Sequence, residues 1–274
     1  MSLRLITDHE VNALLPYMFR YSVAILQIYP DIGKCQIGSG SLIKIKSHYF
    51  VATAAHNLRP HTDEHTYIGF SKEHSTEQLP FIRRWPQPTD PEPDIDLGFI
   101  EISPDRAIDL SEKTFLPLSR ISPFINCWEN RVFLCGFPSE YIPVDLAQKN
   151  TFNLNGMGYL TETINPKSLN KDAKDVSRDI FIDYDEVGVL IDQQEQFKMP
   201  QPYGISGGGL WALPILPHGN LWSPEGTVLI GIERSWLKEY RIAVCTQMQF
   251  WLRLIAEKYS DLTSGINDHL KLYA

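Results

Sequence analysis

The chain has 274 residues, of which 43% are hydrophobic, so it can bury a core as one domain or as two closely packed halves. It carries 25 basic and 33 acidic residues, a formal net charge of −8, with no basic run and no basic patch interleaved with aromatic residues. We therefore expect no nucleic-acid partner. The first ten residues contain acids where a signal peptide needs an apolar core, and no apolar run approaches the about 18 residues of a membrane span, so we expect neither export nor membrane association.

Residues 1–20 are predicted to form a helical extension. Thr7 and Glu10 fit a capping box, and Val11, Leu14, Leu15 and Met18 follow at helical spacing. Pro16 lies inside this segment, so the helix is expected to kink or to end early.

From residue 22 onward the pattern is that of short strands. Apolar runs at 22–28, 38–45 and 49–54 are separated by turn-forming segments, without helical periodicity between them. Closely spaced strands of this kind predict an antiparallel, all-β architecture. Four cysteines lie in such apolar surroundings without a C-x-x-C pair, and we expect them to be buried, reduced thiols: Cys35, Cys127, Cys135 and Cys245.

His56 follows the third of these runs. The small residues 52–55 lead directly to it, which places the imidazole at the edge of a packed strand. The segment 57–94 is irregular, with possible strands at 66–70 and 80–85. His61 and His65, four residues apart, would suit a metal on a helix, but Pro60 and the missing apolar face favour a solvated loop. We expect no metal.

Asp96 stands at the start of another predicted strand, because the residues that follow it alternate between buried and exposed positions. A carboxyl group that enters a core is costly unless it is hydrogen-bonded. A histidine that becomes an imidazolium would be a suitable partner.

The second half of the chain repeats the strand pattern after a connection near 115–118. The predicted strands lie at 131–137, 151–161, 180–184, 187–191, 208–213, 227–232 and 242–246. A helix follows, with its apolar face formed by Met248, Trp251, Leu252, Ile255 and Tyr259.

Ser206 is followed by three glycines, which is typical of a tight turn that presents one hydroxyl group. The turn could be purely structural, or Ser206 could be a nucleophile. It also fits G-x-S-x-G, the elbow of the α/β-hydrolases. That elbow is followed by a helix, whereas residues 208–213 have the pattern of a strand, so the sequence disfavours it.

The order His56, Asp96, Ser206 is that of the chymotrypsin fold. With the motifs at 53–56, 96–100 and 204–208, the chain resembles the trypsin/chymotrypsin-like serine proteases over about residues 20–258. The resemblance implies two antiparallel six-stranded β-barrels with the site between them. The expected domains are a helical extension (1–20), a protease domain (21–258) and a C-terminal tail (259–274); within the protease domain, the barrels cover about 21–118 and 119–246 and a C-terminal helix covers 247–258.

The resemblance also implies roles. Ser206 would be the nucleophile, His56 the base and Asp96 the acid that orients it, while the N–H groups of Gly204 and Ser206 would form the oxyanion hole. No cofactor is implied, and the partner would be a protein or peptide substrate.

The chain departs from the family pattern at three places. Secreted relatives usually carry a cysteine directly after the histidine and another four residues before the serine, where this chain has Asn57 and Pro202. This predicts a cytoplasmic protein of bacterial type. The acid that pairs with a newly cut amino terminus in zymogens is replaced by Ile205, so we expect no activation of the trypsinogen type.

Specificity is predicted from positions relative to Ser206. The base of the primary pocket would be Pro200, which gives no acid to support a preference for Arg or Lys. The walls would come from Glu233, Arg234, Ser235 and Trp236 on one side and from Ala243 on the other, with the register between Glu233 and Arg234 left open.

Three functions are compatible with the sequence. The first is an active intracellular endopeptidase, which the three intact residues favour. The second is a catalytically silent module that binds a peptide. The third is a latent protease whose oxyanion loop is ordered by an activating partner.

Overall fold

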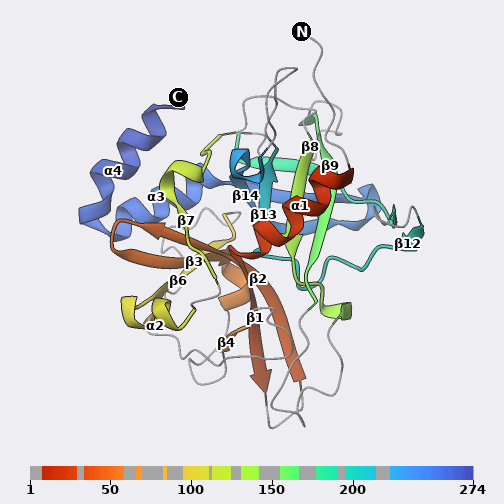
Figure 1. The fold of residues 1–274 in the computed structure, drawn as a ribbon, viewed down its shortest axis with the longest axis horizontal. Helices are drawn as coiled ribbons and strands as arrows, with labels where there is room; N and C mark the ends of the chain where they lie inside the picture. Colours follow the sequence, from red (N-terminus) through yellow and green to blue (C-terminus); the bar gives the residue numbers. More distant parts are fainter. Residues whose placement is uncertain are drawn as a thin grey trace.

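The computed structural model describes residues 8–29, 34–58, 66–69, 83–84, 95–110, 113–124, 131–141, 155–166, 177–189, 195–213 and 223–273 (Figure 1). Within these ranges, no helix is both long enough and apolar enough to cross a membrane.

The first half forms a seven-stranded sheet in the order β4-β1-β2-β3-β6-β5, with β7 paired in parallel to β2 and all other pairs antiparallel. The strands are β1 (Ser22–Tyr29), β2 (Lys34–Ile45), β3 (His48–Ala54), β4 (Thr66–Gly69), β5 (Arg83–Arg84), β6 (Leu97–Ile102) and β7 (Leu116–Pro117).

The second half forms a closed barrel in the order β10-β15-β14-β13-β8-β9. Its strands are β8 (Arg131–Gly136), β9 (Met157–Ile164), β10 (Asp179–Asp183), β13 (Gly209–Ala212), β14 (Val228–Leu237) and β15 (Ile242–Gln247). A separate two-stranded sheet pairs β11 (Val187–Val189) with β12 (Gln196–Lys198).

The prediction of two six-stranded barrels is therefore confirmed for the second half, whereas the first half differs. Among the described residues its sheet is open, with β4 and β5 at the two ends. These end strands have only four and two residues, which leaves little backbone for a further pairing.

In the described part of the chain, four α-helices accompany the strands: α1 (Asp8–Phe19), α2 (Pro104–Asp109), α3 (Met248–Lys258) and α4 (Ser260–Lys271). The predicted leading helix is present. The helix does not end early at Pro16, which was one of the two expectations, because α1 continues to Phe19. Tyr17 and Met18, which follow the proline, are buried, and this packing holds the last turn. The segment treated only as a tail contains α4.

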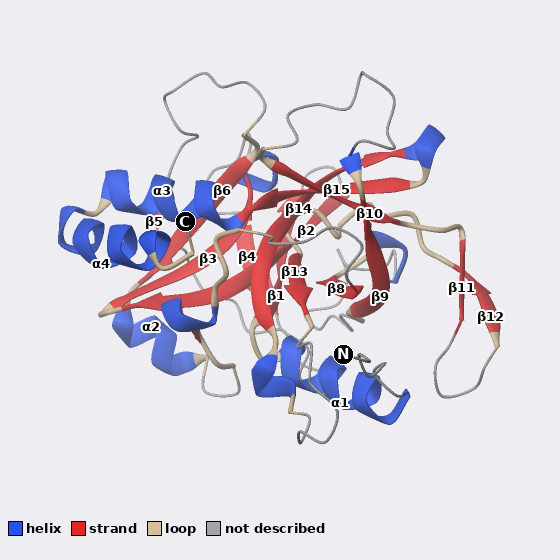
Figure 2. Cartoon of the chain, turned by 90° about the horizontal axis from the view of Figure 1, so that it is seen from above, coloured by secondary structure: helices blue, strands red, loops and turns tan. Residues whose placement is uncertain are grey.

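The helices cover the strands from opposite ends of the chain (Figure 2). On α1, Phe19 packs edge to face on Phe137 after β8, with ring centroids 5.6 Å apart. On α3, the indole N–H of Trp251 donates to the Gly98 carbonyl of β6 at 3.2 Å. Each half is thus covered by a helix from the other end of the chain, which ties the halves together.

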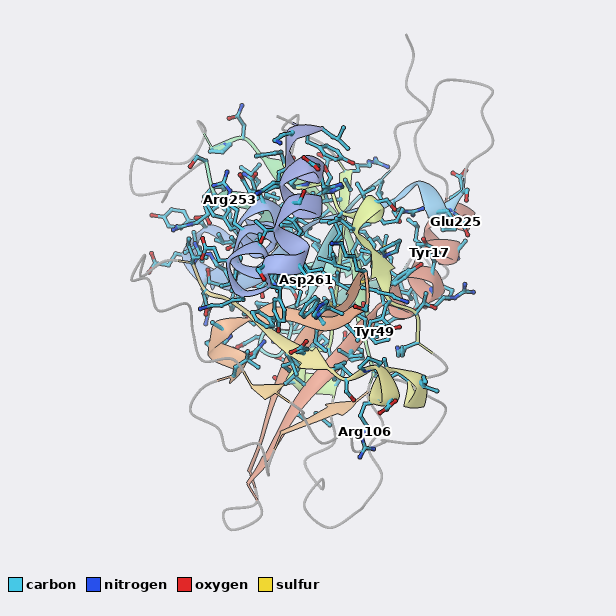
Figure 3. All side chains as sticks on the ribbon, turned by 90° about the vertical axis from the view of Figure 1, so that its left-hand side faces the viewer. Tyr17, Tyr49, Arg106, Glu225, Arg253 and Asp261 are labelled. Carbon is cyan, nitrogen blue, oxygen red and sulfur yellow. The ribbon has the colours of Figure 1, made fainter. Side chains whose placement is uncertain are left out.

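The start of α4 is attached to the first sheet. Asp261, labelled in Figure 3, lies beside the β2–β3 turn, where its carboxylate contacts His48 Nε2 at 3.1 Å and its carbonyl accepts from Lys46 Nζ. Figure 3 also shows Glu225 of the second half beside Tyr17 on α1.

Candidate active site

His56 and Asp96 are brought together by the pairing of β3 with β6. Ala54 pairs with Leu97, and the Ala55 N–H donates to the Asp96 carbonyl at 3.1 Å, so the two side chains leave adjacent strand ends. The short 3₁₀ helix Ala55–Leu58 carries His56 away from the sheet.

Both carboxylate oxygens of Asp96 accept hydrogen bonds from His56. Oδ1 accepts from the backbone N–H at 2.9 Å, and Oδ2 contacts the ring Nδ1 at 2.5 Å. An ionised carboxylate can only accept, so this contact requires the proton on Nδ1 and leaves Nε2 of a neutral ring as the acceptor. The His56 side chain is 38% exposed and that of Asp96 is 24% exposed.

The loop around Ser206 needs glycine at two positions. Gly204 has φ +89° and Gly207 has φ +88°, in the left-handed region that other residues rarely adopt. A Cβ at position 207 would lie 1.9 Å from the Ser39 carbonyl oxygen and 2.2 Å from Thr53 Oγ1. The loop therefore presses directly on β2 and β3.

Polar residues of the first half hold this loop. The Ser206 carbonyl accepts from the Ser39 N–H at 2.7 Å and from Asn57 Nδ2 at 2.6 Å. The Ser39 hydroxyl donates to the Gly204 carbonyl at 2.7 Å and accepts from the Phe137 N–H at 2.8 Å. Asn57 attracts attention in the sequence only as a missing cysteine, and its role in holding the loop was not foreseen.

Apolar packing anchors the loop from the other side. Ile205 is 0% exposed and belongs to the core cluster of the closed barrel together with Leu134 and Leu210. Ile205 is thus held by burial in an apolar environment.

A pocket of about 590 Å³ is lined by residues of both halves. The lining includes the predicted residues His56, Gly204, Ser206, Glu233, Arg234, Ser235 and Trp236. It also includes residues that received no pocket role from the sequence: Asn57, Ser139, Pro202, Tyr203 and Lys238. Two predicted specificity residues are not part of it. The Pro200 carbonyl accepts from the Tyr184 hydroxyl at 2.9 Å, and Ala243 is buried in β15.

Glu233 occupies an unexpected place in this pocket. Its side chain is hydrogen-bonded to the Ser206 side chain, and its Oε2 has no hydrogen-bond partner among the described residues. Burial raises the pKa of Glu233 to about 7, although the Ser206 hydrogen bond and the charges of His56 and Arg234 act in the opposite direction. A carboxyl group beside the predicted nucleophile therefore titrates near neutrality.

The side chain next to Glu233 is held by a buried acid. Arg234 Nη2 donates to Asp179 Oδ2 at 2.9 Å, and Asp179 also accepts from Arg178 Nε at 3.0 Å. Asp179 is fully buried, and these two cations compensate its charge.

Within the described ranges, no cluster of three or more His, Cys, Asp or Glu residues could hold a metal ion. His61 and His65 lie outside those ranges. Cys135 and Cys245 are free and buried, as predicted for them.

No family model and no curated protein matches the chain. Solved structures do match. Neuropsin, a serine protease expressed in the limbic system of mouse brain, gives a TM-score of 0.54 at 13% identity over 89% of this chain and 96% of that one. The active form of the Rv3671c protease from M. tuberculosis gives 0.49 at 12% identity, over 89% and 85% of the two chains.

A thermostable serine protease, AL20, from an extremophilic microorganism gives 0.48 at 13% identity, over 83% of this chain and 91% of that one. At such identities a likeness concerns the fold alone. The neuropsin match shows that the chain has the chymotrypsin-like fold.

Proposed function

We propose that this protein is a serine endopeptidase that hydrolyses peptide bonds through Ser206, His56 and Asp96. The observation that carries the proposal is one pocket lined by both His56 and Ser206, together with the hydrogen bond that Asp96 accepts from His56 Nδ1. A base, the acid that orients it and a hydroxyl nucleophile are the groups that acyl transfer requires.

In this mechanism His56 Nε2 takes the proton of Ser206 as Oγ attacks the carbonyl carbon of the substrate. The resulting imidazolium is stabilised by Asp96 and gives its proton to the leaving amine. Water then attacks the acyl-enzyme with the same base. The pKa of an unperturbed histidine is about 6.5, which suits both proton transfers at neutral pH.

The oxyanion hole would be formed by the N–H groups of Gly204 and Ser206. Among the described residues, neither group donates a hydrogen bond to a backbone carbonyl. A donor aimed at the developing negative charge contributes about 2.7 to 4 kcal/mol to the transition state. The φ of +89° at Gly204 supports this geometry.

The loop that carries these donors is supported by Ser39, Asn57 and buried Ile205. Because none of these contacts depends on a free amino terminus, we propose that the enzyme needs no proteolytic activation of the trypsinogen type. Substrates would be proteins or peptides. We further propose a cytoplasmic, bacterial setting, in keeping with the free thiols of Cys135 and Cys245.

The test is labelling with a fluorophosphonate probe at about pH 6.5 to 7, where the neutral forms of histidine and of a carboxyl group with a pKa near 7 coexist. The native protein should be labelled and Ser206→Ala should not. Profiling the cleavage of a denatured proteome with both proteins would then give the residue preference. A wild type that stays unlabelled while folded would contradict the proposal.

A latent enzyme is the second candidate, and one observation favours it. The Ser206 side chain is hydrogen-bonded to Glu233, a group that competes with His56 for the same hydroxyl. A catalytically silent binding module would give a different result. Neither the wild type nor any variant would then react with the probe, and Ser206→Ala would still bind peptide.

A further inference from the structure

Glu233 is fixed beside Ser206 by the backbone. The Glu233 N–H donates to the Gly208 carbonyl at 2.9 Å, and the Gly207 N–H donates to the Glu233 carbonyl at 2.7 Å. These two bonds join β14 to the residues that directly follow the serine. The position of Glu233 is therefore set by the same strand pairing that builds the loop.

The side chain has little freedom to turn away. Glu233 is 1% exposed, and it lies in the closed barrel opposite Cys245 of β15. One end of the carboxyl group is hydrogen-bonded to Ser206, while Oε2 is buried without a partner in the described part of the chain. An unpaired buried oxygen makes the ionised form costly, because it has lost its hydration without compensation.

The charges around the carboxyl group do not reverse this effect. Glu233 is faced by His56 and Asp96 from the first half, by Arg234 on its own strand, by Cys245 on β15 and by Tyr184 after β10. Arg234 Nη2 donates to Asp179 Oδ2 at 2.9 Å, so the Asp179 carboxylate offsets part of the positive charge of Arg234. Burial raises the pKa of Glu233 more than His56 and Arg234 lower it.

A serine hydroxyl carries one proton and can donate only one hydrogen bond. If that proton is donated to an ionised Glu233, it is not directed at His56. If Glu233 is neutral, its own O–H can donate to Ser206 Oγ, and the Ser206 proton is free to face His56. The protonation state of Glu233 therefore decides whether the Ser206 proton is donated to Glu233 or is directed at His56.

We propose that Glu233 is a fourth catalytic residue, which permits attack by Ser206 when it is neutral and withholds the Ser206 proton from His56 when it is ionised. The inference rests on the proposed serine hydrolase chemistry of this site. It assigns to Glu233 a role distinct from the pocket wall that the sequence suggested.

The reaction step remains balanced. The Ser206 O–H bond breaks, its proton moves to His56 Nε2, and the bond from Oγ to the carbonyl carbon forms. The imidazolium then transfers that proton to the leaving amine as the C–N bond breaks. Glu233 keeps its own proton throughout and is neither consumed nor oxidised.

The experiment measures the rate of fluorophosphonate labelling between about pH 5.5 and about pH 9. Glu233→Gln removes the titrating group with little change of shape. Glu239→Gln is the matched control, because it makes the same acid-to-amide substitution at an exposed glutamate six residues further along. Ser206→Ala gives the background reaction of the probe, and thermal unfolding checks that each protein is folded.

For the wild type we expect labelling to fall about tenfold or more between about pH 7 and about pH 9, because the neutral fraction of a group that titrates near 7 falls by such a factor. Glu239→Gln should show the same alkaline fall in labelling as the wild type. Glu233→Gln should lose the alkaline fall, and at about pH 9 it should react about tenfold faster than the wild type or more.

The outcomes separate the two proposals. Identical pH profiles for wild type and Glu233→Gln would overturn the role of Glu233 and leave the serine hydrolase function standing. Loss of labelling in a folded Glu233→Gln protein would also overturn it, since Glu233 would then be a required proton acceptor. Absence of labelling in both proteins at every pH would contradict the proposed function itself.

A second measurement does not depend on activity or on the folding of Glu233→Gln. Infrared difference spectroscopy follows the C=O band of a protonated carboxyl group in wild type and in Ser206→Ala. The Ser206 hydrogen bond lowers the pKa of Glu233. Its removal should therefore shift the titration to higher pH, and an unchanged titration would show that the contact does not control Glu233.

Discussion

Each half of the molecule contributes one carboxyl group to the candidate active site, and the two groups are held in opposite ways. Asp96, in the open first sheet, is partly exposed, and both of its oxygens accept hydrogen bonds from His56. Glu233, in the closed second barrel, is 1% exposed and has one oxygen without a partner in the described residues. The ionised carboxylate is thus stabilised by hydrogen bonds at Asp96, whereas burial makes it costly at Glu233.

The difference follows from the architecture. The strand ends of β3 and β6 lie at the rim of the first sheet, so the His56–Asp96 pair keeps access to solvent. Glu233 lies within β14, between β13 and β15 of a closed barrel, where its side chain is buried. We therefore expect acid-to-amide substitutions at these two positions to have opposite effects on the chemistry.

His56→Ala should give the largest effect, a loss of labelling of about 10⁴-fold or more, because no base then takes the Ser206 proton. The measurement is the labelling rate near neutrality, with Ser206→Ala as the background. Substantial labelling of His56→Ala that disappears in the double variant His56→Ala/Glu233→Gln would mean that Glu233 acts as a base. The contrast between Asp96 and Glu233 would then not hold.

Asp96→Asn should lower labelling by about 10³ to 10⁴-fold, since the amide no longer fixes the imidazole proton on Nδ1. The exposed Asp268→Asn on α4 is the control for the same chemical change. If Asp96→Asn reacts as fast as this control, the first-half acid has no orienting role. Glu233→Gln should react faster at alkaline pH, which makes the two substitutions a matched and opposite pair.

Stability should depend on pH through Glu233. Its pKa is raised from 4.5 to about 7, so between these values the folded state binds the proton more tightly than the unfolded state does. Stability therefore falls as pH rises through this window, and the loss is complete above the folded value. Between about pH 5 and about pH 8 the wild type should lose about 2 to 3 kcal/mol more than Glu233→Gln, as urea unfolding would measure. Parallel pH dependences of the two proteins would place Glu233 in a less costly environment.

Asn57→Ala should give the smallest effect, about 1 kcal/mol of stability, because the Ser206 carbonyl keeps the Ser39 N–H as a second donor. Labelling should slow by a few fold as the loop loses one of its ties to the first half. The exposed Asn12→Ala on α1 is the control. A labelling rate equal to that of the control would show that Ser39 and Ile205 suffice to hold the loop.

The local patterns of the chain predicted most of the strands and the three residues of the proposed triad. Val51 to Ala54 and Leu97 to Ile102 are apolar runs whose ends place His56 and Asp96. The alternation expected after Asp96 is absent, since Leu97 to Ile100 are all buried. Gly204 and Gly207 were recognisable as turn residues, and their positive φ values agree with that prediction. Local patterns also predicted strands in the second half, whereas their closure into a six-stranded barrel was expected only from the family resemblance.

The sequence by itself determined the strand pattern, the order of His56, Asp96 and Ser206, and the glycines that shape the loop, because each is set by residues close in the chain. Only the tertiary structure decided that the first sheet is open, that Ser39 and Asn57 hold the loop, and that Glu233 contacts Ser206. These features depend on pairing between distant segments and on burial by the whole barrel. No local pattern states which side chains that pairing brings together or how far it shifts their pKa values.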